Sequence, residues 1–456
     1  KRKEMLSLVA LGTMPFVFNR SFAGIVNTKV AYNNKLQSIP RFGDGRDWFF
    51  EKRFGMFVHW GIYSIPAWHE QYQWRASVPR AEYVKFAKHF NPKKFNPSHW
   101  LDLMQEAGME YITFTTKHAD GFCMWDTKQT DYNIMHTPYK KDILGMLSDE
   151  CHKRKVPLCL YYSIVDWHQP NYPNEGGDHE LFKPEPGDQP DWNKYKKFLK
   201  AQVTELCSNY GIIHGFWWDT NARKEHDPSV NAIIRKLQPN AVINNRGFDE
   251  GDFGTPEREE DEDALENKKF TRPTEACQSV DSLSWGYNKD AEYYSDRYLI
   301  RSIDKFLSAN ANYLLNVGPT SEGIIPEVSA NILRRIGKFI KPARESLYLI
   351  EPRPTLVNNP NASYTASGKN LYIHFNKDCS ANGFSLKPLN SLPVKATLLN
   401  DGRPVKFVVR KSPHDFDEIT YGNLKAYLRL ENLPVNELSN TVMVVKLEFD
   451  REISGL

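Results

Sequence analysis

Short β-rich runs alternate with longer amphipathic runs between residues 54 and 320, and this alternation restricts the fold more than any other feature. The β-rich runs carry polar side chains at or near their C-terminal ends and cover residues 55–61, 111–118, 158–163, 215–219 and 241–246. The runs between them have apolar residues at helical spacing and cover residues 99–108, 143–155, 192–211 and 230–239. Strand, helix, strand repetition over roughly 270 residues predicts an α/β fold whose parallel sheet closes as a (β/α)8-like TIM barrel.

The pattern changes after a last predicted helix at residues 328–347. Short strands separated by Asn, Gly and Pro turns follow it, at residues 371–375, 395–400, 405–410, 426–430 and 441–449. We therefore expect a barrel over residues 25–350, with its active site where the strands end, and a C-terminal antiparallel β-sandwich over residues 351–456. The chain has no G-x-G-x-x-G fingerprint, which argues against a dinucleotide-binding doubly wound sheet.

Residues 1–24 are expected to direct export. They begin with basic side chains, continue with an apolar stretch too short to span a bilayer, and end near the small residues Ser21 and Ala23. This pattern resembles a bacterial secretory signal and predicts a periplasmic or secreted protein. The alternative is an apolar segment that packs on the fold. No other segment is apolar enough to predict a membrane span.

The composition narrows the classes of partner and cofactor. The 59 basic and 56 acidic residues leave a net charge of +3, which gives no electrostatic reason to expect nucleic acid as a partner. The six cysteines form no C-x-x-C pair, so we expect mostly buried free thiols. Scattered histidines without an H-E-x-x-H motif predict no metal site. The charged run at residues 257–269 is typical of a solvated loop, and the oligomeric state stays open.

The run "IIHGFWWDTNA" places Asp219 at the exit of a strongly apolar strand, beside Trp217 and Trp218. Aromatic walls exclude water and the strand fixes the direction of the carboxylate, so Asp219 is a candidate nucleophile. The alternative is a helix N-cap, a position that Asp favours. The next strand-end loop supplies Glu257 after a Gly-rich segment, and Glu275 is a further candidate. Two carboxyl groups flanking one bond are the arrangement of glycoside hydrolases.

A series of segments, in order, resembles the α-L-fucosidases of glycoside hydrolase family 29. These segments are "RFGMFVHWGIYSIPAW", "TTKHADGFCMWDTKQTDYNI", "TPYKKDIL", "YYSIVDW", "GFWWD", "GDFGTPE", "SWGYN" and "NYLLNVGPTSEGIIPE", and they cover roughly residues 50–350. The resemblance implies a retaining exo-hydrolase that releases terminal α-L-fucose from a carbohydrate substrate by double displacement, with no cofactor. It also implies a (β/α)8-like barrel followed by a β-sandwich.

The resemblance assigns roles to individual residues. It implies that Asp219 is the nucleophile and Glu257 the acid/base, with Glu275 as the alternative acid/base. The substrate-binding residues that it implies are His59, Glu70, Trp74, His118, Tyr161, Trp217 and Arg246. The family has a Glu-Trp pair after the first strand, and in this chain the pair is altered. One register aligns its Glu with Glu70, which is then followed by Gln71. The other aligns its Trp with Trp74, which is then preceded by Gln73.

Other departures from the family pattern indicate an altered specificity. Ala119 stands where the family usually has a second histidine, and Thr274 stands where it has a tryptophan. One alternative function is therefore an α-L-galactosidase, acting for example on sulfated L-galactose of algal galactans. An anion of that kind could meet cationic side chains on the strand-end loops, for which the candidates are Arg75, Arg223 and Lys224. A non-catalytic sugar-binding relative is the other alternative.

Overall fold

The computed structural model describes residues 39–258, 270, 272–352, 362–386, 391–411 and 426–453. The predicted signal at residues 1–24 lies outside these ranges, as does most of the charged run at residues 257–269. Among the described residues, no helix combines the length and the apolar character needed to cross a membrane.

The predicted parallel sheet is present and has seven strands in the order β5-β4-β3-β2-β1-β7-β6. The strands are β1 (Phe54–Val58), β2 (Tyr111–Lys117), β3 (Leu158–Ser163), β4 (Gly215–Asp219), β5 (Val242–Ile243), β6 (Glu275–Ser279) and β7 (Asn312–Val317). Because all pairings are parallel, the carboxyl ends of the strands meet at one edge, where Ser163 of β3 pairs with Asp219 of β4.

An irregular segment, residues 253–257, lies between the two edge strands of this sheet. Isolated parallel bridges join Phe253 to Asn244, just after β5, and Glu257 to Cys277 of β6. Gly254 also pairs with Thr274, directly before β6. The segment thus runs in the same direction as its neighbours, and Glu257 comes at its carboxyl end.

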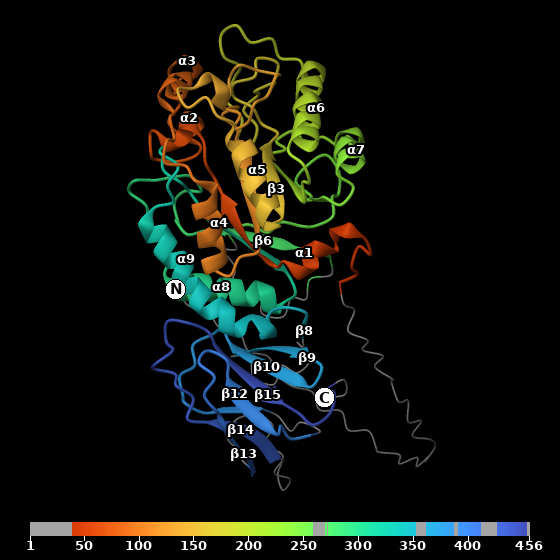
Figure 1. The fold of residues 1–456 in the computed structure, drawn as a ribbon, viewed down its shortest axis with the longest axis vertical. Helices are drawn as coiled ribbons and strands as arrows, with labels where there is room; N and C mark the ends of the chain where they lie inside the picture. The colour runs from red at the N-terminus through yellow and green to blue at the C-terminus, as the bar shows by residue number, and fades with distance from the viewer. Residues whose placement is uncertain are drawn as a thin grey trace, which may run out of the picture. The chain divides into compact units, whose positions relative to one another are not determined.

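Helices lie around the parallel strands (Figure 1). The long ones are α4 (Pro97–Glu106), α5 (Ile143–Arg154), α6 (Trp192–Asn209), α7 (Pro228–Leu237), α8 (Asp296–Ser308) and α9 (Glu327–Ala343), and the short ones are α1 (Trp48–Glu51), α2 (Tyr72–Arg75) and α3 (Arg80–Tyr83). Five of the long helices begin at a side chain that accepts a backbone N–H of the first turn, namely Asn96, Asp142, Asp191, Asp227 and Ser295. Such caps satisfy donors that a helix leaves unpaired at its start, so the helix boundaries follow directly from the local sequence.

The two faces of the parallel sheet contact different apolar clusters. The larger cluster joins the sheet to the helices and includes Val58, Trp100 and Leu333. A smaller cluster gathers side chains of the other face, and its members come from every strand and from the 253–257 segment: Phe57, Tyr111, Cys159, Tyr161, Trp217, Val242, Phe253, Cys277 and Leu314, with Phe49 beside them. Side chains from all strands can converge in this way because the sheet is curled.

The C-terminal part contains two antiparallel sheets. One has the order β12-β15-β10-β9-β8 and the other β11-β14-β13. Their strands are β8 (Glu351–Pro352), β9 (Ser363–Ser367), β10 (Asn370–Phe375), β11 (Phe384–Leu386), β12 (Lys395–Leu398), β13 (Lys406–Lys411), β14 (Ala426–Glu431) and β15 (Met443–Glu448). Residues of both sheets, such as Ile373 and Leu430, share one apolar cluster. A buried contact of 2.7 Å between His374 Nδ1 of β10 and Asp304 Oδ1 ties these strands to α8.

The expected free thiols are confirmed. All six cysteines are unpaired, five are buried, and Cys379 is half-buried. Burial raises the pKa of the Cys123 thiol and of the Cys151 thiol, the latter to about 12, so neither is a reactive thiolate at neutral pH.

We expect Gly337 to be required where α9 crosses α4. A Cβ atom at this position would lie 2.1 Å from the Glu106 carbonyl oxygen, a distance that no packed side chain tolerates. The change Gly337→Ala should therefore force the helices apart and lower the free energy of unfolding by about 1–3 kcal/mol, measured by urea denaturation. Lys338→Ala, a change at an exposed residue of the same helix, is the control and should leave the free energy of unfolding within about 0.5 kcal/mol of the parent value. Equal stability of Gly337→Ala and the control would contradict this contact.

Candidate active site

Asp219 forms the centre of the site because β4 ends there, at the edge where the carboxyl ends of the strands meet. Its carboxylate accepts a hydrogen bond of 2.7 Å from the Tyr161 hydroxyl and one of 3.1 Å from Arg246 Nη1. Burial favours the neutral acid, but the charge of Arg246 and the Tyr161 hydroxyl outweigh it and hold the pKa of Asp219 below its usual value. Asp219 is therefore ionised at neutral pH.

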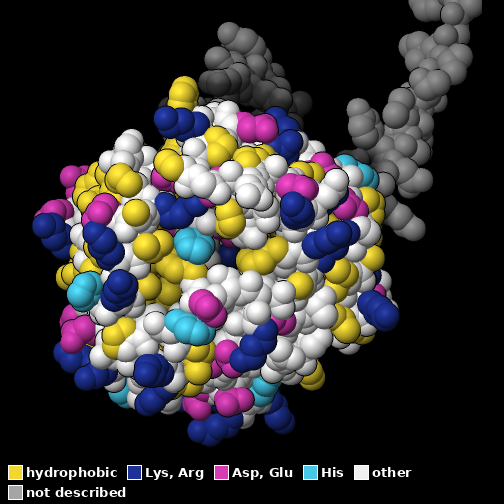
Figure 2. Space-filling view, turned by 90° about the horizontal axis from the view of Figure 1, so that it is seen from above, with side chains coloured by type: hydrophobic (Ala, Val, Ile, Leu, Met, Phe, Trp, Pro, Cys, Tyr) yellow, Lys and Arg dark blue, Asp and Glu magenta, His cyan; other side chains and the backbone are white. Residues whose placement is uncertain are grey.

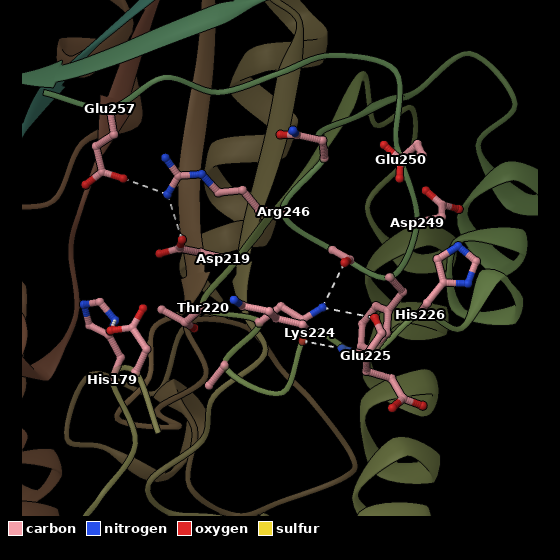
Figure 3. A pocket seen from close by; sticks show the side chains of 16 residues that line it. His179, Asp219, Thr220, Lys224, Glu225, His226, Arg246, Asp249, Glu250 and Glu257 are labelled. Atoms are coloured by element: carbon pink, nitrogen blue, oxygen red, sulfur yellow. Dashed lines mark hydrogen bonds and ion pairs between the residues drawn. The ribbon is translucent and has the colours of Figure 1, made fainter. Parts of the chain in front are cut away.

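Arg246 holds a second carboxylate next to Asp219. The same atom, Nη1, lies 2.7 Å from Glu257 Oε2. Because the distances of 3.1 Å and 2.7 Å meet at one nitrogen, the two carboxylate oxygens lie no more than 5.8 Å apart. Arg246 is itself fixed, since its Nε donates to the Thr255 hydroxyl at 2.7 Å and its guanidinium carbon lies 4.7 Å from the centre of the Trp217 ring. Figure 3 shows Glu257 and Asp219 on either side of Arg246.

Glu275, expected as an alternative acid/base, lies at the other end of the sheet from Asp219. It is the first residue of β6, where it pairs with Asn312 at the start of β7, so it belongs to the opposite end of the sheet. Its buried carboxyl group accepts hydrogen bonds from Trp217 Nε1 at 3.0 Å and from the Tyr111 hydroxyl at 2.5 Å. Burial raises the pKa of Glu275 to about 7. The Trp217 indole thus lies between Glu275 and the Arg246 guanidinium, and Glu275 supports the wall of the site from behind.

Two of the predicted histidines lie beside Asp219. His59 follows β1, and its Nδ1 lies 2.7 Å from Asn316 Oδ1. The Asn316 amide nitrogen donates to the Ser279 hydroxyl and to the Trp285 carbonyl oxygen, so Asn316 Oδ1 must accept and His59 Nδ1 must carry the proton. The remaining nitrogen, Nε2, is consequently an acceptor in the neutral ring.

His118 follows β2 and stacks on Tyr161, with the ring centres 5.8 Å apart and the planes 5° from parallel. Its buried Nδ1 finds no hydrogen-bond partner within the described part of the chain. Burial lowers the pKa of His118 to about 3 and that of His59 to about 4. Both rings are therefore neutral at physiological pH, and both can exchange hydrogen bonds with hydroxyl groups of a ligand.

Glu70 is buried close to His59 and His118, whereas Trp74 lies on α2. The buried Glu70 carboxylate accepts hydrogen bonds from the Ser284 hydroxyl and from the backbone N–H groups of Trp285 and Gly286 at 2.9–3.1 Å. Burial opposes its ionisation, but the pKa of Glu70 still falls to about 2 because His69, His118, His59 and the Gly286 N–H stabilise the anion. Glu70 thus fixes the 284–286 segment. Trp74, on α2, is half-buried and lies against the ring of His179.

A cavity of about 510 Å³ opens at Asp219. Its wall consists of Asp178, His179, Asp219, Thr220, Asn221, Ala222, Lys224, Glu225, His226, Asn245, Arg246, Gly247, Phe248, Asp249, Glu250 and Glu257. Figure 2 shows this face hollowed near its centre, with histidine, basic and acidic side chains around the hollow. The cavity therefore contains both candidate carboxylates, whereas Glu275 is not part of its wall.

The cationic candidates for an anionic substrate are mostly engaged elsewhere. Arg75 Nε donates to the Gln71 side chain, and Arg223 pairs with Glu175 and lies over the Trp192 ring. Lys224 lines the cavity. Thr274, expected near the pocket, precedes β6 at the far end of the sheet, and Ala119 is buried. Among the described residues, no three His, Cys, Asp or Glu side chains gather as metal ligands.

Three further residues of the site were not predicted from the sequence. Trp285 packs against His59 with ring centres 5.3 Å apart, Asn316 fixes the His59 tautomer, and His179 lines the cavity. Trp285 and Asn316 lie in the quoted segments "SWGYN" and "NYLLNVGPTSEGIIPE", which were the available signal. His179 lies in a long loop without periodicity, and the sequence gives no signal for it.

The chain is similar to known alpha-L-fucosidases in sequence and in fold. The family model described as Alpha-L-fucosidase matches residues 22–345. Tissue alpha-L-fucosidase of Bos taurus is 26% identical over 397 residues, which cover 80% of this chain and 82% of that protein. Alpha-L-fucosidase isoenzyme 1 from Paenibacillus thiaminolyticus has a solved structure with 30% identity and a TM-score of 0.77, covering 89% of this chain and 100% of that one.

A further solved structure shares the fold at 23% identity, with a TM-score of 0.74 over 90% of this chain and 98% of that one. It is described as an alpha-L-fucosidase of Bacteroides thetaiotaomicron, trapped as a covalent intermediate in complex with 2-fluoro-fucosyl fluoride.

The neutral histidines should make the protein sensitive to acid. As the pH falls below about 6.5, His118 gains a proton in the unfolded chain but stays neutral in the fold until about pH 3, so folding stability decreases through this window. Between pH 7.5 and pH 5.0, the free energy of unfolding of the parent should fall by about 2 kcal/mol more than that of His118→Gln, measured by urea denaturation. Acidic groups with a raised pKa, such as Glu275, change the pH dependence of folding stability in the opposite direction. Because they are present in both proteins, their effect cancels in the comparison of His118→Gln with the parent.

The control is His136→Gln, a change at an exposed residue, and its free energy of unfolding should fall as much as that of the parent. An identical pH dependence in His118→Gln and the parent would mean that His118 is protonated in the fold.

Proposed function

Because this chain belongs to the alpha-L-fucosidase family, we propose that its hydrolysis of terminal α-L-fucosides proceeds at Asp219 and Glu257 by double displacement. The protein is a glycoside hydrolase that releases fucose. One observation carries the assignment of the two residues: both carboxylates contact Arg246 Nη1 and therefore lie within 5.8 Å of each other. A separation of roughly 5–5.5 Å is typical of retaining glycosidases, whereas inverting enzymes need more room for a water molecule.

In the first step, an Asp219 carboxylate oxygen attacks the anomeric carbon of the terminal fucosyl unit. The bond to the glycosidic oxygen breaks as Glu257 transfers its proton to that oxygen, and the aglycone leaves as an alcohol. In the second step, Glu257 removes a proton from a water molecule, whose oxygen attacks the same carbon and displaces Asp219. Two inversions return the sugar to its α configuration. The depressed pKa of Asp219 supports its role as the nucleophile, because the attacking group must be ionised.

The neighbouring side chains are suited to hold the sugar. His59 presents an acceptor nitrogen, His118 has a free buried nitrogen within the described structure, and both lie beside Tyr161. The buried Trp217 ring lies against the Arg246 guanidinium. We propose that the two histidines bind hydroxyl groups of the fucosyl ring, while Glu70 and Trp74 support the surrounding loops. No step requires a metal ion or an organic cofactor.

We also propose that the 253–257 segment completes a (β/α)8-like barrel over residues 25–350, followed by a sandwich over residues 351–456. The parallel bridges at both sides of the segment support this closure, since they link β5 to β6. Closure would have a functional consequence: Glu257, in the irregular 253–257 segment, would share the rim with Asp219 at the end of β4.

The charge of the cavity wall favours a neutral substrate over a sulfated one. Six carboxylates line the wall, against Lys224 and Arg246, and Arg246 is already paired with two of the six. A sulfate group would lose hydration and meet a net negative field. We therefore propose an uncharged fucosylated glycan as the substrate class.

Substitution of Asp219 tests the nucleophile. Asp219→Ala should lower kcat/KM on 4-nitrophenyl α-L-fucoside by a factor on the order of 10⁴ or more, because no covalent intermediate can form. Thermal unfolding of the variant serves as the control for an intact fold. NMR of the parent reaction should show α-fucose as the first product. A loss of tenfold or less, or initial release of the β-anomer, would exclude the double displacement at Asp219.

A comparison of two glutamates tests the acid/base. Glu257→Gln should lower kcat by about 10²–10⁴ on a glycan with a sugar aglycone, and by much less on 4-nitrophenyl fucoside, whose leaving group needs little protonation. The matched change Glu275→Gln keeps an acceptor for Trp217 Nε1 and should affect both substrates equally. If Glu275→Gln shows the dependence on the leaving group and Glu257→Gln does not, the two roles are exchanged.

A further inference from the structure

The long loop between β3 and α6 brings a histidine to the cavity from outside the strand ends. His179 lines the same cavity as Asp219 and Glu257. Figure 3 shows its imidazole on the side of Asp219 that faces away from Glu257. His179 therefore belongs to the wall of the cavity that holds both candidate carboxylates.

The loop is held in a conformation that directs this residue. His179 has a φ angle of 62°, in the left-handed region that non-glycine residues rarely adopt. Its carbonyl oxygen accepts a hydrogen bond of 2.7 Å from Trp167 Nε1. The next side chain, the buried Glu180, accepts hydrogen bonds from the Tyr172 hydroxyl and from two backbone N–H groups of the loop. Strain that is fixed so firmly by its surroundings is characteristic of functional positions.

The ring of His179 is oriented by two contacts. Its Nδ1 lies 2.8 Å from Asp178 Oδ1, and the Trp74 ring lies 5.3 Å away at 34°. In the neutral ring Nδ1 donates to Asp178, so Nε2 is an acceptor. No hydrogen bond from the described residues reaches Nε2, and about a third of the side chain is exposed. An acceptor nitrogen on a fixed ring at a cavity wall is suited to bind a hydroxyl group.

We propose that His179 Nε2 accepts a hydrogen bond from a hydroxyl group of the sugar unit whose anomeric carbon faces Asp219, and that this contact contributes to sugar specificity. The proposal rests on the function proposed above. It extends the sugar-binding set from the strand ends, where His59 and His118 lie, to the loop after β3. It also gives a role to Trp74 and Asp178, which position the ring.

The test uses two substitutions at one position and monodeoxy substrates. Both His179→Ala and His179→Gly should lower kcat/KM on 4-nitrophenyl α-L-fucoside about tenfold, the value of one ordinary hydrogen bond. His179→Gly should keep or raise the melting temperature, because glycine adopts the left-handed conformation freely. A side chain with a merely structural role would instead lower the melting temperature when removed.

Among monodeoxy fucosides, one should react equally well with the parent and with His179→Gly, since it lacks the hydroxyl group that His179 binds. The others should retain the tenfold difference. His136→Ala is the matched control, because His136 is also paired with an aspartate, Asp131, but is exposed and is not part of the cavity wall. It should leave every rate unchanged.

The outcomes separate the two proposals. If the parent hydrolyses α-L-fucosides and His179→Gly stays within twofold of it, or loses the same factor on every deoxy substrate, the role of His179 is overturned while the function stands. If the parent hydrolyses no α-L-fucoside, the proposed function fails and the assignment of His179 fails with it.

Discussion

The site depends on the sharing of one guanidinium between two carboxylates. When both groups are ionised, two negative charges at most 5.8 Å apart repel each other by at least about 3 kcal/mol at an effective dielectric constant of 20, and this would push apart groups that must meet across one bond. Arg246 removes the repulsion by contacting both through Nη1. It can do so because Thr255 and the Trp217 ring fix its position independently of either carboxylate. The spacing of the pair is therefore set by a third residue.

The position of Arg246 depends in turn on polar groups inside the curled sheet. Trp217 must hold its ring still to support the guanidinium, and its indole N–H is anchored by Glu275, which Tyr111 also contacts. Burying a carboxyl group costs folding free energy unless hydrogen-bond donors satisfy it, so each residue in this series of contacts depends on the next. Contacts of this kind link the start of β6 to the end of β4 and make the wall of the cavity part of the core.

The sequence predicts those strands that have a clear apolar periodicity and those site residues that lie at the ends of such strands. Strands β1 to β5 and the convergence of Asp219, Arg246 and Glu257 could be predicted, because parallel strands bring their carboxyl ends to one edge. Strands β6 and β7 were not recognised, since buried polar residues such as Gln278 and Asn316 interrupt their apolar pattern. The position of Glu275 could not be predicted for the same reason: the sequence does not show at which end of the sheet a short polar strand begins. His179 could not be found because a loop has no period from which to derive its position.

Burial of the histidines suits a reaction that develops positive charge. The transition states of glycoside hydrolysis resemble an oxocarbenium ion, which imidazolium groups nearby would destabilise. Burial holds His59 and His118 neutral, and the full positive charge that contacts Asp219 is that of Arg246, which also contacts Glu257. A neutral ring can still distinguish sugar hydroxyls, provided that its other nitrogen has a fixed partner. Asn316 supplies that partner for His59, and its own amide is locked by Ser279 and Trp285. Burial therefore keeps the charge of His59 low, while Asn316 sets the direction of its hydrogen bonds.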